Sequence, residues 1–242
     1  MSLSGLMKVG AHPVRPSLTG LMIVLTAVTG LVEAVSLLAL GPVFTAMQTG
    51  NVLFLAFGLA REGNVPALSA ALSLASFAVG AVVGARLESV TEARGWRWLG
   101  LGLYAEAALI LTGAATGWNL APRYGDPAGP HLAVTGLVAT AMGIRTVTSM
   151  RVNVPGVPTT LVTRSMTAFI GSSALGRDSA FGYGTGAWAR RAVAVVAMFT
   201  GGLTGALLVR AGWTVGELLL PAAAVVPAVA LAHRTLPRLH TT

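Results

Sequence analysis

The chain lacks cysteine and contains few charged residues. Without cysteine it can form no disulfide, no thiolate metal site and no cysteine nucleophile. Only 10% of its 242 residues are charged and 54% are apolar, whereas about 25% of an ordinary soluble domain is charged. This composition excludes a soluble monomer.

Lysine is nearly absent as well. Fifteen of the sixteen basic residues are arginine, and Lys8 is the single lysine. The formal net charge of +8 therefore does not come from a lysine-rich tail or a nucleic-acid patch. We expect no nucleic-acid partner.

Motifs of catalysis and cofactor binding are also missing from the sequence. It has no His-Glu-x-x-His zinc motif, no Gly-x-Ser-x-Gly elbow, no phosphate-binding glycine loop ending in lysine, and no paired carboxylates on one helix face. We therefore expect no enzyme activity, no metal and no cofactor. The missing nucleotide loop and the lack of a sizeable soluble domain argue against an ATP-driven pump.

What the sequence does have is a series of long apolar stretches. A membrane-spanning helix needs about 20 apolar residues, and short connections carrying nearly all the charge separate eight candidates: 17–40, 43–60, 66–85, 98–118, 131–150, 157–175, 192–209 and 213–232. Each candidate holds at most one charged residue; those found, in chain order, are Glu33, Glu106, Arg145, Arg164 and Glu217. We predict a single all-α transmembrane domain over residues 1–242.

The positions of the basic residues predict how many stretches cross the membrane, because Lys and Arg in short loops stay on the cytoplasmic side. If all eight cross with the N-terminus inside, nine bases lie inside and five outside. If the second and sixth stretches instead enter the membrane and return to the side from which they came, eleven basic residues lie inside and three outside. We therefore predict a membrane helix bundle with about six crossings, two broken or re-entrant helices and both termini in the cytoplasm.

An internal repeat supports the same arrangement. Residues 39–51 align with residues 153–165, since each segment has a Gly/Pro break, then a Thr, and another Thr four residues later. Further along, Phe77 and Gly80 resemble Phe199 and Gly202. The halves, about 17–118 and 131–232, would each hold three crossings and one odd segment. An odd number of crossings makes the second half upside down, which predicts an inverted repeat of the kind found in transporters.

The two odd segments begin with residues that disfavour helix, Gly41-Pro42 in one and residues 155–158 in the other. Proline is tolerated in the first helical turn, because its missing N–H would be unpaired there anyway. We therefore predict that helices begin at Pro42 and Pro158, at membrane depth, where their N–H groups need a polar partner. The first crossing should then end near Val35 to leave an extended leg before the break.

Polar side chains follow both breaks, several of them at helical spacing. Two such helix starts meeting near the midplane would form a site for a small polar or anionic solute. The alternative is that the threonines bond back to their own helices and the breaks join ordinary spans. The predicted solute-binding residues are Thr45, Gln48, Thr49, Asn51, Thr159, Thr160, Thr163, Arg164 and Arg145.

Four charged residues lie either inside an apolar stretch or next to one of the two breaks. They are Glu33, Glu106, Arg145 and Arg164. A charge at the centre of a membrane helix costs about 2.5–3.5 kcal/mol on insertion scales, so it usually faces a cavity or a partner. One interpretation makes Glu33 and Glu106 proton or cation sites, with the two arginines holding an anionic group or pairing with those acids. The alternative is a structural ion pair, or an Arg145 that snorkels towards the cytoplasmic surface.

Small residues recur at four-residue spacing in two of the stretches. Gly80 and Gly84 form one such set, and Gly201 and Gly205 form the other. This spacing lets helices approach closely. The glycines would serve packing within the bundle or, alternatively, a face between two copies of the chain, so a homo-oligomer is possible.

The segments around both breaks resemble the YoaK-like family of bacterial membrane proteins. The resemblance rests on residues 39–41 with Phe44 and residues 49–51, and then on residues 155–160 with Thr163. It covers nearly the whole chain and implies a bacterial inner-membrane protein of about six helices, in a family of unestablished function. The family pattern has Gln-Asn where Arg145-Thr146 stand, and Gly where Arg164 stands.

Two classes of function remain. A secondary transporter or channel for a small solute is favoured, because breaks, threonine clusters and intramembrane charges coincide. The alternative is a non-transporting membrane protein that binds a lipid or protein partner and uses its polar residues for helix packing. The partners expected are therefore membrane lipid and, for a transporter, a small solute.

Overall fold

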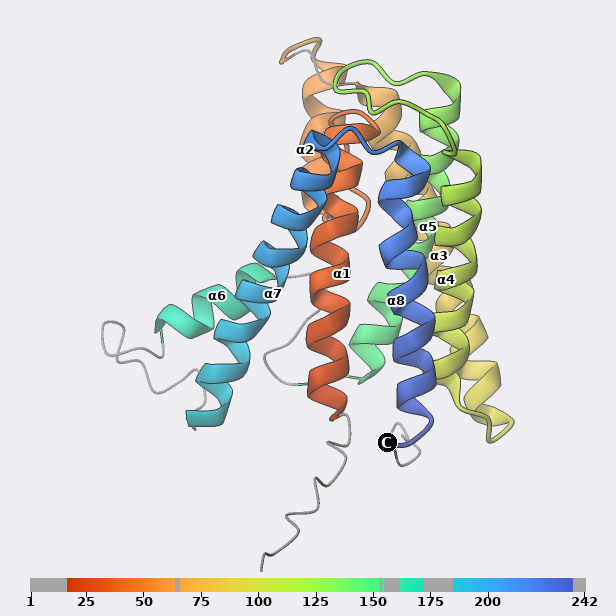
Figure 1. The fold of residues 1–242 in the computed structure, drawn as a ribbon, viewed down its shortest axis with the longest axis vertical. Helices are drawn as coiled ribbons and strands as arrows, with labels where there is room; N and C mark the ends of the chain where they lie inside the picture. Colours follow the sequence, from red (N-terminus) through yellow and green to blue (C-terminus); the bar gives the residue numbers. More distant parts are fainter. Residues whose placement is uncertain (1–16, 64–65, 153, 155–161, 172–184, 237–242) are drawn as a thin grey trace, which may run out of the picture.

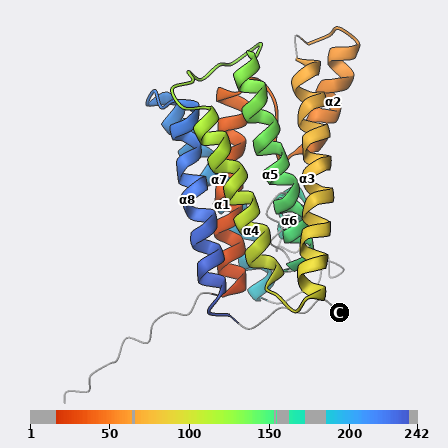
Figure 2. The ribbon, with the colours of Figure 1, turned by 90° about the vertical axis from the view of Figure 1, so that its right-hand side faces the viewer.

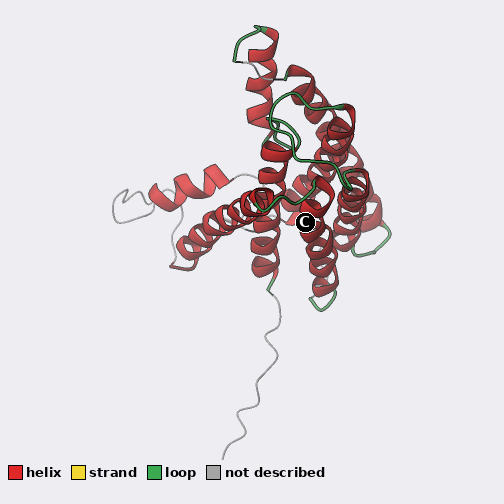
Figure 3. Ribbon diagram, turned by 45° about the horizontal axis from the view of Figure 1, so that its top comes forward, coloured by secondary structure: helices red, strands yellow, loops and turns green. Residues whose placement is uncertain are grey.

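The computed structural model describes residues 17–63, 66–152, 154, 162–171 and 185–236. These residues form helices joined by turns and loops, without a strand (Figure 3). The helices are α1 (Leu18–Ala39), α2 (Gln48–Leu59), α3 (Ala67–Ala93), α4 (Trp98–Thr116), α5 (Gly129–Val152), α6 (Val162–Gly171), α7 (Thr185–Arg210) and α8 (Val215–His233). The predicted all-α helix bundle is confirmed.

Six of these helices are long and apolar enough to cross a membrane, namely α1, α3, α4, α5, α7 and α8. Successive spans alternate in direction, so that the start of α1 and the end of α8 lie at the same end of the bundle (Figures 1 and 2). The helix α2 has 12 residues, about 18 Å at 1.5 Å per residue, which is too short for a hydrocarbon core of about 30 Å. The side of the membrane on which the termini lie stays a prediction.

Local signals in the sequence account for the ends of the spans. The Ser17 side chain caps α1 by accepting a hydrogen bond from the backbone N–H of Gly20 at 3.0 Å. At α8, Thr214 and Glu217 form a reciprocal capping box. Gly95 and Gly212 have φ values of 70° and 84° in the tight turns that follow α3 and α7, a conformation that glycine adopts without strain.

Glycines set the two closest helix pairs, α1 with α7 and α3 with α5. A Cβ added to Gly201 of α7 would lie 1.8 Å from the carbonyl oxygen of Ala27 in α1. In the other pair, a Cβ added to Gly80 would lie 2.0 Å from the carbonyl oxygen of Thr140, and one added to Gly143 would lie 2.3 Å from that of Phe77. The small-residue positions therefore serve packing within the bundle, as the first of the two alternatives predicted.

The outward faces of several spans are apolar. The exposed side chains include Val79, Val82 and Val83 on α3, and Val196, Phe199, Leu203 and Leu207 on α7. Apolar faces of this extent on a monomeric chain mark contact with lipid or with another protein. Together with the lengths of the six helices, they identify the chain as a multi-pass membrane protein.

The structure corrects two predicted boundaries near the first break. The helix α1 continues to Ala39 and does not end near Val35, and α2 begins at Gln48 instead of Pro42. Pro158, the predicted start of the second odd helix, lies outside the described residues, and α6 begins at Val162. The inverted repeat and the re-entrant path of the two short helices stay predictions.

Candidate functional site

The first candidate site is the segment between α1 and α2, residues 40–47, which is not helical. Its turn at Gly41 has a φ of 104°, which suits a residue without a Cβ. Because this backbone is not in a helix, its polar groups need other partners if it lies within the bundle. The side chains of two helices supply these partners, as described next.

Glu33 of α1 holds the end of this segment. Its Oε1 accepts hydrogen bonds from the backbone N–H of Thr45 at 3.0 Å, from the Thr45 hydroxyl at 3.1 Å, and from the backbone N–H of Ala46. The Ser36 hydroxyl oxygen lies 2.9 Å from that of Thr45. One carboxylate oxygen therefore satisfies two backbone N–H groups just before α2 begins, and this explains why α2 does not start at Pro42.

Asn51 of α2 and Ser73 of α3 hold the middle of the segment at Phe44. The Asn51 amide accepts from the Phe44 backbone N–H at 3.0 Å and donates to the Phe44 carbonyl oxygen at 2.6 Å. The Ser73 hydroxyl also donates to that carbonyl at 2.6 Å, and Gln48 donates to the Thr45 carbonyl at 2.8 Å. We call these contacts, together with those of Glu33 and Ser36 described above, the α2 anchor. Through the 40–47 segment they tie α2 to α1, and through Ser73 they tie it to α3.

The depth of the α2 anchor follows from the position of Glu33. Glu33 lies six residues before the end of α1, so it sits about 9 Å below that end at 1.5 Å per residue. In Figure 2, α2 packs beside α3 at the same end of the bundle where α1 finishes. Non-helical backbone at such depth is tolerated only where protein or a polar cavity surrounds it.

The structure distributes the predicted solute-binding residues unevenly. Thr45 and Asn51 are buried within the α2 anchor, Gln48 is half-buried, and Thr49 is exposed. Thr163 is exposed on α6, and Arg164 lies in the same helix, although its side chain is not among the described parts. Thr159 and Thr160 lie outside the described residues. Their roles in binding stay predictions.

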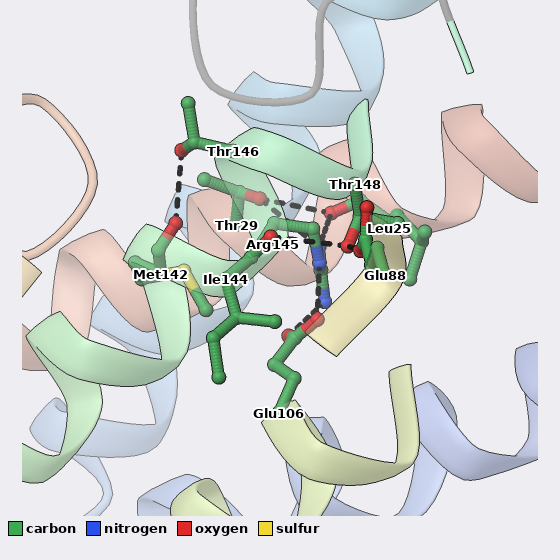
Figure 4. A network of polar contacts seen from close by, with 9 residues as sticks. All are labelled: Leu25, Thr29, Glu88, Glu106, Met142, Ile144, Arg145, Thr146 and Thr148. Carbon is green, nitrogen blue, oxygen red and sulfur yellow. Dashed lines mark hydrogen bonds and ion pairs between the residues drawn. The ribbon is translucent and has the colours of Figure 1, made fainter. Parts of the chain in front are cut away.

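Arg145 of α5 and Glu106 of α4 form a second polar site, which Figure 4 shows from close by. The Arg145 guanidinium donates to both carboxylate oxygens of Glu106, at 2.7 Å through Nε and also through Nη2. Its Nη1 donates to the Leu25 carbonyl oxygen of α1 at 2.8 Å and lies 3.3 Å from the Thr29 hydroxyl. This ion pair therefore joins three spans.

The pairing of Arg145 with Glu106 matches one of the arrangements that the sequence allowed. Both side chains are fully buried, and burial makes such a pair depend on complete hydrogen bonding. Glu33 does not share in the pair; its partners are the donors of the α2 anchor. The roles predicted for Arg145 in solute binding and for Glu106 in ion coupling stay predictions.

A third group, which the sequence analysis did not single out, lies at the end of α3. The Glu88 carboxylate accepts from the Thr148 hydroxyl of α5 and lies 3.4 Å from Nε of Arg151. A Cβ added to Gly102 of α4 would lie 2.5 Å from Glu88 Oε1, so the glycine makes room for the carboxylate. Arg151 also pairs with Glu92.

A signal for this group exists in the sequence. Arg145, Thr148 and Arg151 follow one another at three-residue spacing, which places them on one face of a helix. Glu88 and Glu92 lie four residues apart, also on one face of α3, so the expectation of no paired carboxylates on one helix face is wrong here. Ser73 of the α2 anchor carries no comparable signal, because a single serine in an apolar helix is common.

Among the described residues, no group of three or more His, Asp or Glu side chains could hold a metal ion. The sites consist of carboxylates, amides, hydroxyls and one buried guanidinium, placed between membrane-spanning helices. The fold and these sites define the class of the protein as a polytopic helical membrane protein.

Comparison with known proteins gives the family. The family model described as "Protein of unknown function (DUF1275)" matches residues 21–232, so the chain belongs to that family. The chain is also similar to the UPF0700 transmembrane protein YoaK of Bacillus subtilis (strain 168), with 23% identity over 151 residues. The matched part is 62% of this chain and 64% of the relative, so it spans less than two thirds of the relative's length. No solved structure matches the chain.

The family match confirms the YoaK-like resemblance that the two break segments indicated. The match supports the assignment of the chain as an integral membrane protein, and the relative is itself described as a transmembrane protein.

Proposed function

We propose that the protein is a secondary transporter or channel for a small polar solute in the bacterial inner membrane. The observation that carries the proposal is the α2 anchor, in which non-helical backbone lies within a bundle of spans and is held by side chains of α1, α2 and α3. Transporters bind solutes at such interruptions, near the bilayer midplane.

The arrangement of the helix pairs adds support for an inverted repeat. The pair α1 and α7 and the pair α5 and α3 correspond if the second half repeats the first. Each pair makes its closest approach at glycines, with Gly201 and Gly205 facing α1 and with Gly80 and Gly84 facing α5. Two matched helix pairs around a common centre suit a mechanism in which one half rocks against the other.

The first half of the proposed site favours a neutral or hydrogen-bonding solute. The N–H groups of Thr45 and Ala46 already donate to Glu33, so they are not free for an anion. The exposed Thr49 and the half-buried Gln48 stand next along α2. In the proposed second half, Thr159, Thr160, Thr163 and Arg164 would supply hydroxyl groups and a positive charge for an anionic group.

A thermal-shift screen in detergent tests where a solute binds. The panel contains polyols, amino acids, small carboxylates and inorganic oxyanions. We expect at least one of them to raise the unfolding temperature, and we expect Thr49→Ala to weaken that rise. Thr112→Ala is the matched control, since Thr112 is also exposed and bonds only to its own helix at Ala108. Equal stabilisation of both variants, or no stabilisation by any solute, would contradict the proposed site.

A second candidate function is binding of a lipid or protein partner without transport. The complete burial and mutual pairing of Arg145 and Glu106 favour this candidate, because paired charges can serve helix packing alone. It predicts binding without movement of a solute across the membrane. A flux measurement therefore separates the two candidates.

A further inference from the structure

Glu33 differs from the other buried glutamates in its charge partners. Glu106 pairs with Arg145, and Glu88 lies 3.4 Å from Nε of Arg151. Among the described residues, Glu33 has no arginine or other cation within ion-pair distance. Glu33 is 4% exposed, so bulk solvent does not replace the missing cation.

The two oxygens of Glu33 also differ from each other. Oε1 accepts from three donors of the α2 anchor. Oε2 is buried and has no hydrogen-bond partner among the described residues. A buried polar atom without a partner costs about 1–3 kcal/mol, and more if it carries charge.

In the part of the chain that the structure describes, no charged group of the neighbouring elements lies within ion-pair distance of Glu33. The segment 40–47 and α2 contain no ionisable side chain. Arg145 reaches α1 at Leu25, eight residues before Glu33, which is about 12 Å along the helix. The remaining charged or titratable groups of the packed elements lie at or near element ends or in the loop beside Ala39: Arg190, Arg191 and Arg210 on α7, Glu217 and His233 on α8, His131 and Arg151 on α5, Arg86, Glu88 and Glu92 towards the far end of α3, and Arg123, Tyr124 and Asp126 in the loop.

A proton is the ligand that fits this arrangement. Protonation of Oε2 removes the unpaired charge and leaves Oε1 free to accept the same bonds from Thr45 and Ala46. A metal ion would need several further oxygen ligands, and no cluster of acidic or histidine side chains supplies them among the described residues. Protonation of Glu106 would instead break its ion pair with Arg145.

We propose that Glu33 is the proton-binding carboxyl of this protein, taking up and releasing one proton at Oε2 while Oε1 keeps its hold on the α2 anchor. If the protein transports a solute as proposed above, Glu33 is then the group that couples transport to protons, and Glu106 is not. Because Oε1 touches the backbone just before α2, a change of charge on Glu33 acts directly on the segment that carries the proposed solute site.

Infrared spectroscopy of the protein in lipid bilayers tests this assignment. We expect a carboxylic acid C=O band that grows as the pH falls and is lost in Glu33→Gln. Glu33→Asp keeps a carboxyl group and should shift the band. Glu62→Gln is the control, since Glu62 is exposed, and should leave the band unchanged. Gln retains an oxygen that can accept from Thr45 and Ala46, so this variant is expected to fold, which a melting curve checks.

Sodium provides the second arm of the test. At constant pH, exchange of choline chloride for sodium chloride should not change the band. A wild-type spectrum identical to that of Glu33→Gln at every pH would overturn the proposal, as would loss of the band on addition of sodium. The measurement needs no solute, so an intact band without solute flux would count against the proposed transport and not against the proton site.

Discussion

Arg145 of α5 and Glu106 of α4 form a two-point ion pair in which both side chains are fully buried. Glu106→Gln removes the negative charge and leaves a buried guanidinium without its counter-ion. We expect the free energy of unfolding to fall by about 3–5 kcal/mol. Thermal unfolding in detergent, followed by tryptophan fluorescence, measures the change.

The double variant Glu106→Leu with Arg145→Met is the comparison for this prediction. It removes both charges and keeps the volume apolar, which is often neutral or stabilising for a buried pair. We expect it to melt closer to the wild type than Glu106→Gln does. A double variant as unstable as the single one would show that the fold needs the hydrogen bonds of Arg145 to Leu25 and Thr29.

The close approach of α1 and α7 predicts a difference between two adjacent glycines. A Cβ on Gly201 would lie 1.8 Å from the Ala27 carbonyl oxygen, whereas one on Gly202 would lie 3.7 Å from its nearest neighbour, the Gly30 carbonyl oxygen. Gly201→Ala should therefore force the helices apart and lower the stability by about 1–3 kcal/mol. Gly202→Ala should leave the melting temperature nearly unchanged. Equal effects of the two substitutions would argue against this helix contact.

The α2 anchor predicts a stability loss on removal of the Asn51 amide. Asn51→Ala leaves the part-buried backbone N–H of Phe44 without its acceptor, which costs up to about 1–3 kcal/mol. Val52→Ala is the matched control, because Val52 is the next residue along and is 55% exposed. Melting curves of both variants should separate them, and a harmless Asn51→Ala would mean that the anchor does not hold the segment.

The absence of native cysteine makes the topology directly testable by single-cysteine labelling. Glu62 follows α2 and Ser89 lies near the far end of α3, and both are exposed. In cells, Glu62→Cys should react with a membrane-impermeant maleimide from outside, and Ser89→Cys only after the membrane is opened. The reverse pattern would mean either that the six-span bundle has its termini outside or, with the N-terminus inside, that eight stretches cross.

Much of the fold is predictable from the sequence, because length and apolar composition give the candidate spans and the positions of the basic residues reduce eight candidates to six crossings. The six spans, the short α2 and the role of Gly80, Gly84 and Gly201 all follow from such patterns. The start of α2 does not, because the rule for proline at helix starts takes no account of distant side chains. Glu33, twelve residues before Thr45, accepts from the N–H groups of Thr45 and Ala46, which in a helix starting at Pro42 would instead donate to the carbonyl oxygens four residues earlier.

The polar sites are predictable in part. The positions of Arg145 and Glu106 in the sequence indicate how deep they lie in the membrane, but not the direction in which their side chains point. The sequence is therefore compatible with an ion pair and also with separate roles in solute binding and ion coupling. The apolar stretch 66–85 leaves Glu88 in the charged connection that follows it, whereas α3 continues to Ala93 and Glu88 contacts Thr148 of α5. A search for three-residue and four-residue spacing of polar residues beyond the apolar stretches would have found it.

Solute flux into proteoliposomes shows whether the protein moves a solute across a membrane. Purified protein is inserted into liposomes with an imposed pH gradient, and uptake is measured for the panel of polyols, amino acids, carboxylates and oxyanions. We expect at least one solute to enter faster than it enters protein-free liposomes, and we expect Glu33→Gln to abolish the effect of the pH gradient. Uptake no faster than in protein-free liposomes for every solute, with folded and inserted protein, would contradict transport and favour a lipid-binding or partner-binding membrane protein.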